Sequence, residues 1–470
     1  MRFSSWRRIL LCAGVSTAML AAFAPSAFAR LRVHWMAGDR APGTPVKYDK
    51  VGVLKVGSPK ARNVLVLEPG TSAGSAYFVP LARWIVAQRP GWQVWSVERR
   101  ENLLEDQSDL NRAKAGRASA TAVFDYYLGY LSDPSITDHY QPPAPTSDSF
   151  AKHWGMNVAV HDLHAVITAA RQVATRRGGK IVLGGHSLGG SVVTAYATWD
   201  FSGRPGADGL AGLVYDDGGS GPAESAATAR TALGQLDASS SSPWLAFGGI
   251  AAPYAGLFES SGAIGALLAP SAPSLGQAFS LLPSDLKPPV PATNLAQYGY
   301  ALNAGTSPAS LLAAQGHLGA GLATTPTNGL YGWNGAGALT PITRFATMFS
   351  GFGVNGADGV EWYFPQRLTD DTAAVGNGLA NPAQKVLGVH ATMGRKLPRD
   401  LLMFAFGTAL GRSAVPAAAR ALARQSHIPR RNLMLADYAS TYAHNDPAGA
   451  YPHNAFFTRL LRFLARVNRS

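Results

Sequence analysis

The sequence predicts an α/β fold, a mostly parallel sheet flanked by helices, for most of its 470 residues. Short apolar runs typical of buried strands alternate with segments of helical periodicity near both ends of the chain, which indicates parallel βαβ units. One apolar run, residues 181–183, leads through a glycine-rich turn that carries a serine into a segment of small residues suited to a helix. With 47% hydrophobic residues, the chain can also bury a large core.

Residues 1–29 are expected to be an export signal. A start with three arginines precedes an apolar run at 9–24, and Ala27-Phe28-Ala29 has the small-residue pattern of a cleavage site. The apolar run is short for a membrane span and no stop-transfer pattern follows it, so we expect cleavage near Ala29-Arg30 and no stable membrane span afterwards. The mature protein would be periplasmic or secreted. An uncleaved anchor is the alternative, and the export route stays open.

Removal of this signal would take away Cys12, the only cysteine, and lower the formal charge from +13 to +10. A mature chain without thiols excludes disulfides, thiolate catalysis and cysteine-ligated metals. The basic surplus could favour an acidic ligand, but the arginines are scattered and no nucleic-acid motif accompanies them, so we expect no nucleic-acid partner. His161 and His164 lie one helical turn apart without a third ligand nearby, and we expect neither a metal nor another cofactor.

The first half of the chain follows the α/β rhythm after a lead-in at 30–47 that Pro and Gly interrupt. Strands are expected at 50–56, 63–67 and 93–97, with a helix at 76–88. Glu98-Arg99-Arg100-Glu101 follows the last of these strands, and we expect it to be a surface ion-pair network without a catalytic role. Residues 101–155 are longer than a simple crossover and carry several aromatics. We expect them to form a minor cap excursion over the carboxyl edge of the sheet.

The second half keeps this rhythm at its two ends. Helices are expected at 157–176, 191–197, 414–425 and 456–467, and strands at 210–215, 400–406 and 432–436. Residues 220–395 lack the rhythm; they are poor in charge, rich in Ala, Gly, Ser, Pro and Leu, and contain recurring aromatics. We therefore expect a core built from 30–219 and 396–470, with 220–395 inserted as a cap or lid.

The turn Gly185-His186-Ser187-Leu188-Gly189-Gly190 resembles the nucleophile elbow of lipases and esterases that have the α/β-hydrolase fold. The resemblance covers most of the chain after the first few dozen residues and is weak across the middle. It implies that Ser187 is the catalytic nucleophile. It also implies that 220–395 is the cap that many members carry after the sixth strand, where an apolar lining would suit an acyl chain.

The resemblance further implies where the partners of Ser187 lie. His444 follows the last expected strand, where the family carries its general base, and His453 is the competitor. The acid usually follows the seventh strand, but Gly407-Thr408-Ala409 contains no carboxylate. Some members carry the acid after the sixth strand, where Asp216-Asp217-Gly218-Gly219 stands. We therefore assign Asp217 as the acid and keep Asp216 as the alternative.

The oxyanion hole is expected at Pro69-Gly70-Thr71-Ser72, after the strand at 63–67. In the family the corresponding loop supplies one backbone N–H, often directly after a His-Gly pair. Here Pro69 stands in place of that histidine, which leaves the backbone donor in place. The expected donors are the N–H of Thr71, with Ser72 as the backup, and the N–H of Leu188.

Together these residues indicate covalent acyl transfer. A serine hydroxyl is a weak nucleophile near neutral pH, so a histidine must take its proton and a carboxylate must orient the histidine. We expect an exported, carboxylesterase- or lipase-like serine hydrolase whose substrate is an apolar or lipid-like ester. Two alternatives stay open: an acyltransferase with the same triad, and a non-catalytic binding protein on a hydrolase scaffold. The sequence does not identify the substrate, because substrate binding depends on the inserted residues 220–395.

Overall fold

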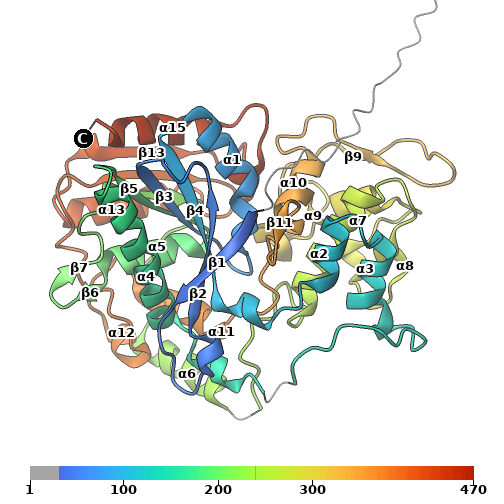
Figure 1. The fold of residues 1–470 in the computed structure, drawn as a ribbon, viewed down its shortest axis with the longest axis horizontal. Helices are drawn as coiled ribbons and strands as arrows, with labels where there is room; N and C mark the ends of the chain where they lie inside the picture. The colour runs from blue at the N-terminus through green and yellow to red at the C-terminus, as the bar shows by residue number, and fades with distance from the viewer. Residues whose placement is uncertain (1–30, 145–146, 239, 470) are drawn as a thin grey trace, which may run out of the picture. The chain divides into compact units, whose positions relative to one another are not determined.

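A nine-stranded sheet forms the centre of the computed structural model, which describes residues 31–144, 147–238 and 240–469 (Figure 1). The expected export signal lies outside the described residues. Across the sheet the strands are β11 (Val354–Asn355), β1 (Leu31–Ala37), β2 (Lys50–Val56), β4 (Trp92–Glu98), β3 (Asn63–Glu68), β5 (Ile181–His186), β8 (Gly212–Asp216), β12 (Leu402–Gly407) and β13 (Leu433–Asp437). Only β2 runs antiparallel to its neighbours in this sheet, which confirms the predicted mostly parallel arrangement.

The register of the parallel strands brings their carboxyl ends to one edge. Glu68 at the end of β3 lies opposite Gly185 in β5, and His186 at the end of β5 lies opposite Asp216 in β8. Asp216 in turn lies opposite Phe406 near the end of β12. The residues that follow these strands therefore meet at a single edge, where ligands bind in open α/β sheets.

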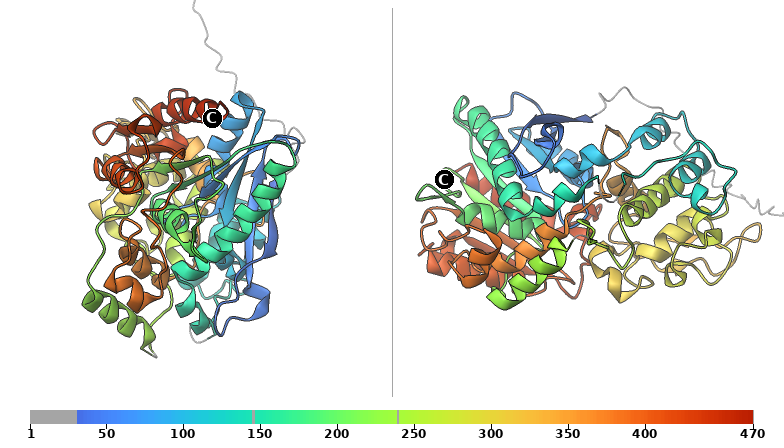
Figure 2. Two further views of the ribbon diagram at one scale, coloured as in Figure 1. Left: turned by 90° about the vertical axis from the view of Figure 1, so that its left-hand side faces the viewer. Right: turned by 90° about the horizontal axis from the view of Figure 1, so that it is seen from below.

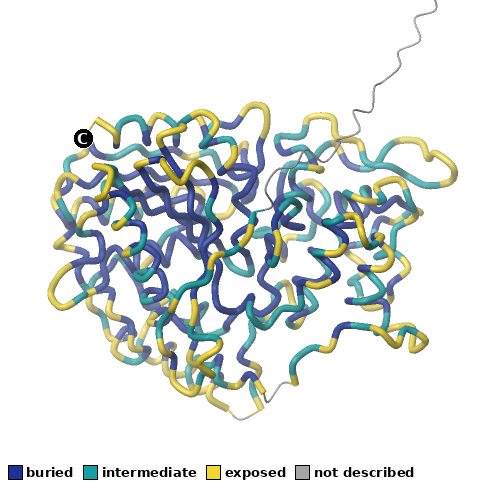
Figure 3. The backbone as a smooth tube through the Cα atoms, in the orientation of Figure 1, coloured by how far each residue is buried: buried dark blue, intermediate teal, exposed yellow. Residues whose placement is uncertain are grey.

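Helices cover both faces of the sheet, because alternate residues of each buried strand point to opposite sides. One face packs against α1 (Val79–Gln88) and α15 (Ala455–Val467). The other packs against α4 (Met156–Thr175), α5 (Leu188–Thr198) and α13 (Ala414–Gln425). The strands between them are almost entirely buried, as the dark blue tube in Figure 3 shows, and the arrangement confirms the predicted α/β fold class.

The chain between β8 and β12 forms two helical groups. One group, α7 (Tyr254–Leu268), α9 (Asn294–Leu302) and α10 (Ile342–Ser350), packs with α2 (Ser108–Lys114) and α3 (Ala120–Tyr127) beside the sheet (Figures 1 and 2). The other group, α6 (Ala226–Asp237), α11 (Gln366–Val375) and α12 (Pro382–Leu387), packs near α5. The remaining short elements are α8 (Leu275–Ala278), α14 (Asp446–Gly449), β6 (Asp200–Phe201), β7 (Arg204–Pro205), β9 (Gly321–Leu322) and β10 (Trp333–Asn334). The division into core and cap stays a prediction.

One strand was not predicted and one local prediction was wrong. The lead-in at 30–47 contains a full strand, β1, which pairs antiparallel with β2 from Val33 opposite Leu54 to Ala37 opposite Lys50. Its burial largely alternates along the chain, so its period-2 pattern was present in the sequence beside the Pro- and Gly-containing loop. The expected surface network Glu98-Arg99-Arg100-Glu101 is buried, because it follows a strand in the interior of the sheet.

In the part of the chain that the structure describes, no helix has the length and apolar character needed to cross a membrane.

Candidate active site

Ser187 lies at the tip of a sharp turn between β5 and α5. Its φ of 54° and ψ of −129° fall in a region that residues with a side chain rarely adopt, so the surrounding packing must hold it there. A Cβ at Gly185 would overlap the carbonyl group of Gly189, and a Cβ at Gly189 would overlap the carbonyl oxygen of Glu68. The two glycines of the G-x-S-x-G pattern are therefore required by close backbone packing, which fixes Ser187 above the carboxyl edge of the sheet.

His444 and Asp217 form a buried pair beside this turn. His444 lies in the loop after β13, and its Nδ1 is 2.6 Å from Oδ2 of Asp217, which follows β8. Burial by itself would raise the pKa of Asp217, but hydrogen bonds from His444 and Thr408 outweigh it and hold that pKa below its ordinary value. An ionised carboxylate only accepts hydrogen bonds, so Nδ1 of His444 donates to it, and Nε2 is the ring nitrogen left to act as a base.

Thr408 occupies the place after β12 where the sequence offered no acid. Its N–H donates to Oδ1 of Asp217 over 2.6 Å, and its hydroxyl donates to Oδ2. The N–H of Gly411 adds a third donor from the same loop, 3.0 Å from Oδ1. In the family that the sequence resembles, this loop usually supplies the acid. In this structure it supplies the donors that orient an acid from the neighbouring strand. Thr408 was missed because carboxylates were the only residues sought at that strand end.

Asp216, the alternative acid, is not brought to His444. It is the last residue of β8 and is buried, and neither of its carboxyl oxygens has a hydrogen-bond partner among the described residues. Burial, and then the charge of Asp217, raise the pKa of Asp216 well above its ordinary value. The competing base, His453, is exposed in the loop before α15.

Ser187 and His444 line the same cavity, which has a volume of about 160 Å³. Thr71 and Ser72 line it as well, and a Cβ added to Gly70 would come within 2.9 Å of Cβ of Ser187. Leu188 is the first residue of α5, so its N–H has no acceptor within the helix. The structure therefore pairs the predicted base with the predicted acid, places the predicted nucleophile and base on the wall of one cavity, and sets the turn that carries Thr71 beside Ser187.

Arg99 forms hydrogen bonds that hold the turn carrying Thr71. Its guanidinium donates to the carbonyl oxygens of Gly70 at 3.2 Å and Ala73 at 3.3 Å, and also to that of Pro69. Its Nε donates to Oε1 of Glu68 at 3.0 Å. Burial raises the pKa of Glu68 to about 6, although the charge of Arg99 opposes the shift. Because these carbonyl groups are held inward, the backbone of the turn is fixed where Thr71 faces the cavity. Arg99 was missed because the charge cluster to which it belongs is typical of an exposed surface.

A second group of buried side chains supports the His444 loop. His186 packs its ring against that of His444, with centroids 4.4 Å apart, and its Nε2 donates to the carbonyl oxygen of His444 at 3.1 Å. Tyr77 also stacks on His186 and donates to Oδ1 of Asn445 at 2.9 Å. Burial, and then the charge of His444, lower the pKa of His186 to about 3, so His186 is neutral and acts as a packing and donor group.

The loop is also tied to the segment between β8 and β12. His317 Nδ1 lies 2.6 Å from Oδ2 of Asp446, two residues after His444. The same carboxylate accepts from the N–H of Ala443 at 2.7 Å and from the hydroxyl of Thr340 at 2.8 Å. Hydrogen bonding to Asp446 raises the pKa of His317. These contacts join the base-bearing loop to residues of the predicted insertion.

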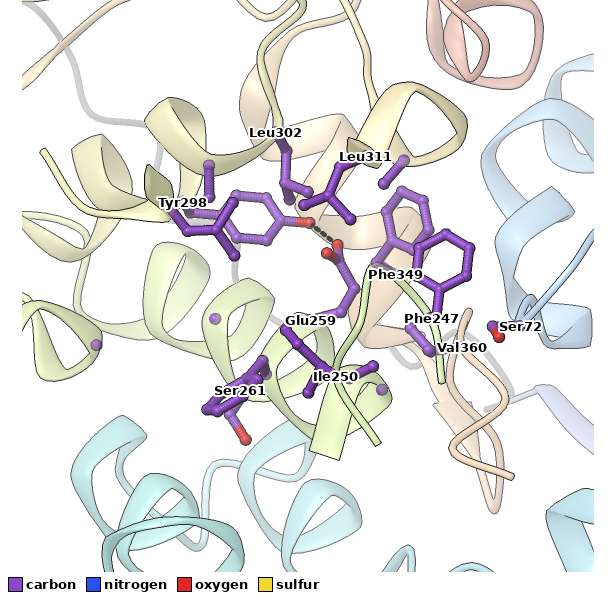
Figure 4. Close-up of a pocket in the computed structure, with 18 of the residues that line it drawn as sticks. Ser72, Phe247, Ile250, Glu259, Ser261, Tyr298, Leu302, Leu311, Phe349 and Val360 are labelled. Carbon is purple, nitrogen blue, oxygen red and sulfur yellow. Dashed lines mark hydrogen bonds between the residues drawn. The ribbon is translucent and has the colours of Figure 1, made fainter. Parts of the chain in front are cut away.

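The cavity walls are mainly apolar and come from α3, α7, α9, α10 and the loops between them (Figure 4). The larger apolar side chains are Phe124, Leu128, Phe247, Ile250, Phe258, Leu275, Leu282, Leu286, Leu302, Leu311, Phe349 and Val360. Among the described residues, no group of three or more His, Cys, Asp or Glu side chains is arranged to hold a metal ion. The site therefore combines a buried polar set at the sheet edge with an apolar chamber beside it.

Comparisons with known proteins gave distant structural matches. The chain matches no protein-family profile and no curated protein sequence. Among solved structures, it is similar to a soluble variant of monoglyceride lipase from Saccharomyces cerevisiae, with 11% identity, a TM-score of 0.39, and coverage of 92% of this chain and 94% of that chain. It is also similar to a carboxyl esterase from Bacillus coagulans, with 10% identity, a TM-score of 0.39, and coverage of 93% of this chain and 97% of that chain.

The fold itself is decided by the topology. The central sheet runs β1-β2-β4-β3-β5-β8-β12-β13, all parallel from β4 onward, with helices on both faces. A glycine-flanked serine stands on the turn from β5 into α5, above the carboxyl edge of that sheet. With this strand order and this strand–turn–helix, the chain has the α/β-hydrolase fold.

Proposed function

We propose that the protein is a serine hydrolase that cleaves carboxylic esters with an apolar acyl group. The observation that carries the proposal is the buried His444–Asp217 pair at 2.6 Å, next to a cavity that Ser187 and His444 both line. A pair of this kind can accept a proton from a serine and return it to a leaving group. Fold alone would not justify an activity, so the proposal depends on these particular side chains.

The reaction follows from the roles of the residues. Oγ of Ser187 attacks the ester carbonyl carbon while Nε2 of His444 takes the hydroxyl proton, and Asp217 stabilises the resulting imidazolium. The N–H groups of Thr71 and Leu188 hold the negative charge on the carbonyl oxygen. Collapse of the tetrahedral intermediate breaks the bond to the alcohol, which leaves with the proton from His444. Water then repeats the sequence on the acyl-enzyme and releases the acid.

The substrate class follows from the chamber. Its apolar walls would bury an alkyl chain, with a gain of about 0.8 kcal/mol for each methylene removed from water. We propose that 220–395 acts as the cap over the acyl site, with 101–155 as a smaller part of it. The signal-like pattern of residues 1–29 supports export, so the ester would be met in the periplasm or outside the cell.

The test compares the wild type with Ser187→Ala and His444→Ala on p-nitrophenyl esters of increasing acyl length. We expect hydrolysis by the wild type and a loss of about 10³-fold or more in both variants. His453→Ala serves as the matched control, because this exposed histidine lies in a nearby loop, and it should retain full activity. A folded wild type that hydrolyses no member of a broad ester and amide panel refutes the proposal. Product analysis with added alcohols separates hydrolysis from acyl transfer.

A further inference from the structure

One ionisable pair lies inside the otherwise apolar chamber. Glu259 of α7 accepts a hydrogen bond from the hydroxyl of Tyr298 of α9, with 2.7 Å between the oxygens (Figure 4). Both residues line the cavity together with Ile250, Leu302 and Leu311. In the view of Figure 4, Phe247, Phe349 and Val360 lie toward the side of the cavity where Ser72 stands, and the Glu259–Tyr298 pair lies away from it.

The protein leaves this carboxyl group incompletely satisfied. Two carboxylate oxygens can accept about four hydrogen bonds, and among the described residues only Tyr298 donates to Glu259. Burial raises the pKa of Glu259 to about 7; Tyr298 opposes the shift and the charge of Asp358 adds to it. Glu259 nevertheless keeps part of its surface accessible, and it lines the cavity. An apolar residue would serve better at this position if the only requirement were to pack α7 against α9.

Two further oxygens on the cavity lining lack partners. Oγ of Ser261 and Oε1 of Gln297 are buried without a hydrogen-bond partner in the part of the chain that the structure describes. Both residues therefore add polar groups to a cavity wall that is otherwise mainly apolar. Above its raised pKa Glu259 is ionised and can only accept hydrogen bonds, so the ligand group that suits its second oxygen is a donor.

We propose that Glu259 determines specificity by accepting a hydrogen bond from a hydroxyl or ammonium group on the apolar part of the ester. This inference rests on the proposed ester hydrolysis and names a feature of its substrate: an alkyl chain that carries a donor at a distance from the ester carbonyl. Tyr298 positions the carboxyl group by holding one of its oxygens and leaves the other facing the chamber.

The test uses matched p-nitrophenyl esters whose chains end in a methyl, a hydroxyl or an ammonium group, over a range of chain lengths. The readout is the ratio of kcat/KM for the donor-bearing ester to that for the methyl-ended ester of equal length, so changes in overall activity cancel. We expect the wild type to favour a donor at one range of chain lengths, by about 10- to 100-fold, because a hydrogen bond to a charged group contributes about 1.5–3 kcal/mol.

Two variants assign that preference to Glu259. Glu259→Leu should abolish it for both donors. Glu259→Gln, which keeps the side-chain shape, should lose the preference for ammonium and keep part of the preference for hydroxyl. If the Leu variant does not fold, the Gln variant still decides through the ammonium series. Asp285→Asn is the matched control, because Asp285 is an exposed carboxylate next to the cavity-lining Leu286, and its ratios should equal those of the wild type.

The outcomes separate this inference from the proposed function. Hydrolysis that depends on Ser187 but shows no donor preference at any chain length, or the same preference in the Glu259 variants, overturns the role of Glu259 and leaves the hydrolase standing. If a folded wild type cleaves none of the esters, or if their cleavage does not depend on Ser187, the hydrolase itself is refuted.

Discussion

Asp217→Asn should abolish the proposed hydrolysis by reversing a single hydrogen bond. The N–H groups of Thr408 and Gly411 are fixed donors to Oδ1, so the amide oxygen of the new side chain takes that position. The amide nitrogen then faces His444, whose Nδ1 lies 2.6 Å from the second oxygen in the wild type. Two donors cannot form a hydrogen bond with each other, so His444 must adopt the tautomer that carries its proton on Nε2. In that tautomer Nε2 cannot act as a base toward Ser187.

The expected loss is about 10³- to 10⁴-fold in kcat, which corresponds to about 4–5.5 kcal/mol in the activation barrier. Asp216→Asn is the matched control. Its carboxyl oxygens have no hydrogen-bond partner among the described residues, and its raised pKa favours the neutral form that Asn imitates. We expect its kcat/KM to stay within about threefold of the wild type, since its charge orients nothing in the site.

The assay measures kcat and KM for one p-nitrophenyl ester, together with urea unfolding of each variant to show that it is folded. If Asp216→Asn loses as much activity as Asp217→Asn, or more, the assignment of the acid is wrong. If Asp217→Asn keeps nearly full activity while folded, the tautomer argument fails.

Substitutions at three other positions, Thr408, Arg99 and Glu361, test the surroundings of the site. Thr408→Val removes the hydroxyl that donates to Asp217 and keeps the N–H, so kcat should fall by about 10- to 100-fold with KM unchanged, and Thr408→Ser should restore most of it. Arg99→Met leaves Glu68 buried without its counter-ion and removes the hydrogen bonds that hold the turn carrying Thr71. We expect the free energy of unfolding in urea to fall by about 3–5 kcal/mol and kcat to fall as well. Arg99→Lys should not restore either value, because lysine lacks the planar guanidinium group. Burial raises the pKa of Glu98 and of Glu101 to about 7. The folded state therefore binds more protons than the unfolded chain between about pH 4.5 and pH 7. As a result, the free energy of unfolding should fall as the pH rises through that window. The carboxyl group of Glu361 lies among these acids, and its pKa is also raised, by burial and then by Glu98. Glu361→Gln should therefore flatten the decline between about pH 4.5 and pH 7, and an unchanged slope would contradict this account.

The parts of the site that depend on local backbone geometry could be predicted from the sequence. The glycines around Ser187 are required by the turn itself, and the α/β rhythm fixes which strand ends lie at the same edge. Asp217 was assigned because the resemblance allows an acid after the sixth strand and because a residue followed by glycines can turn inward. Asp217 and His444 are 227 residues apart in the sequence, so only the folded structure shows that their side chains meet.

Other residues could not be predicted because their role depends on what packs over them. Arg99 belongs to a charge cluster that is typical of an exposed surface, and only the position of β4 inside the sheet buries it. Thr408 carries no charge, and its function appears only once Asp217 lies against it. Glu259 and Tyr298 lie on two helices 39 residues apart, and no sequence periodicity indicates that they meet.

Labelling with a fluorophosphonate tests the central claim most directly, because the probe reacts only with a serine whose hydroxyl is deprotonated by a base. We predict a single adduct on the peptide that contains Ser187, none in His444→Ala, and slow labelling in Asp217→Asn. A folded wild type that acquires no adduct at Ser187, or that labels equally well without His444, would contradict the account.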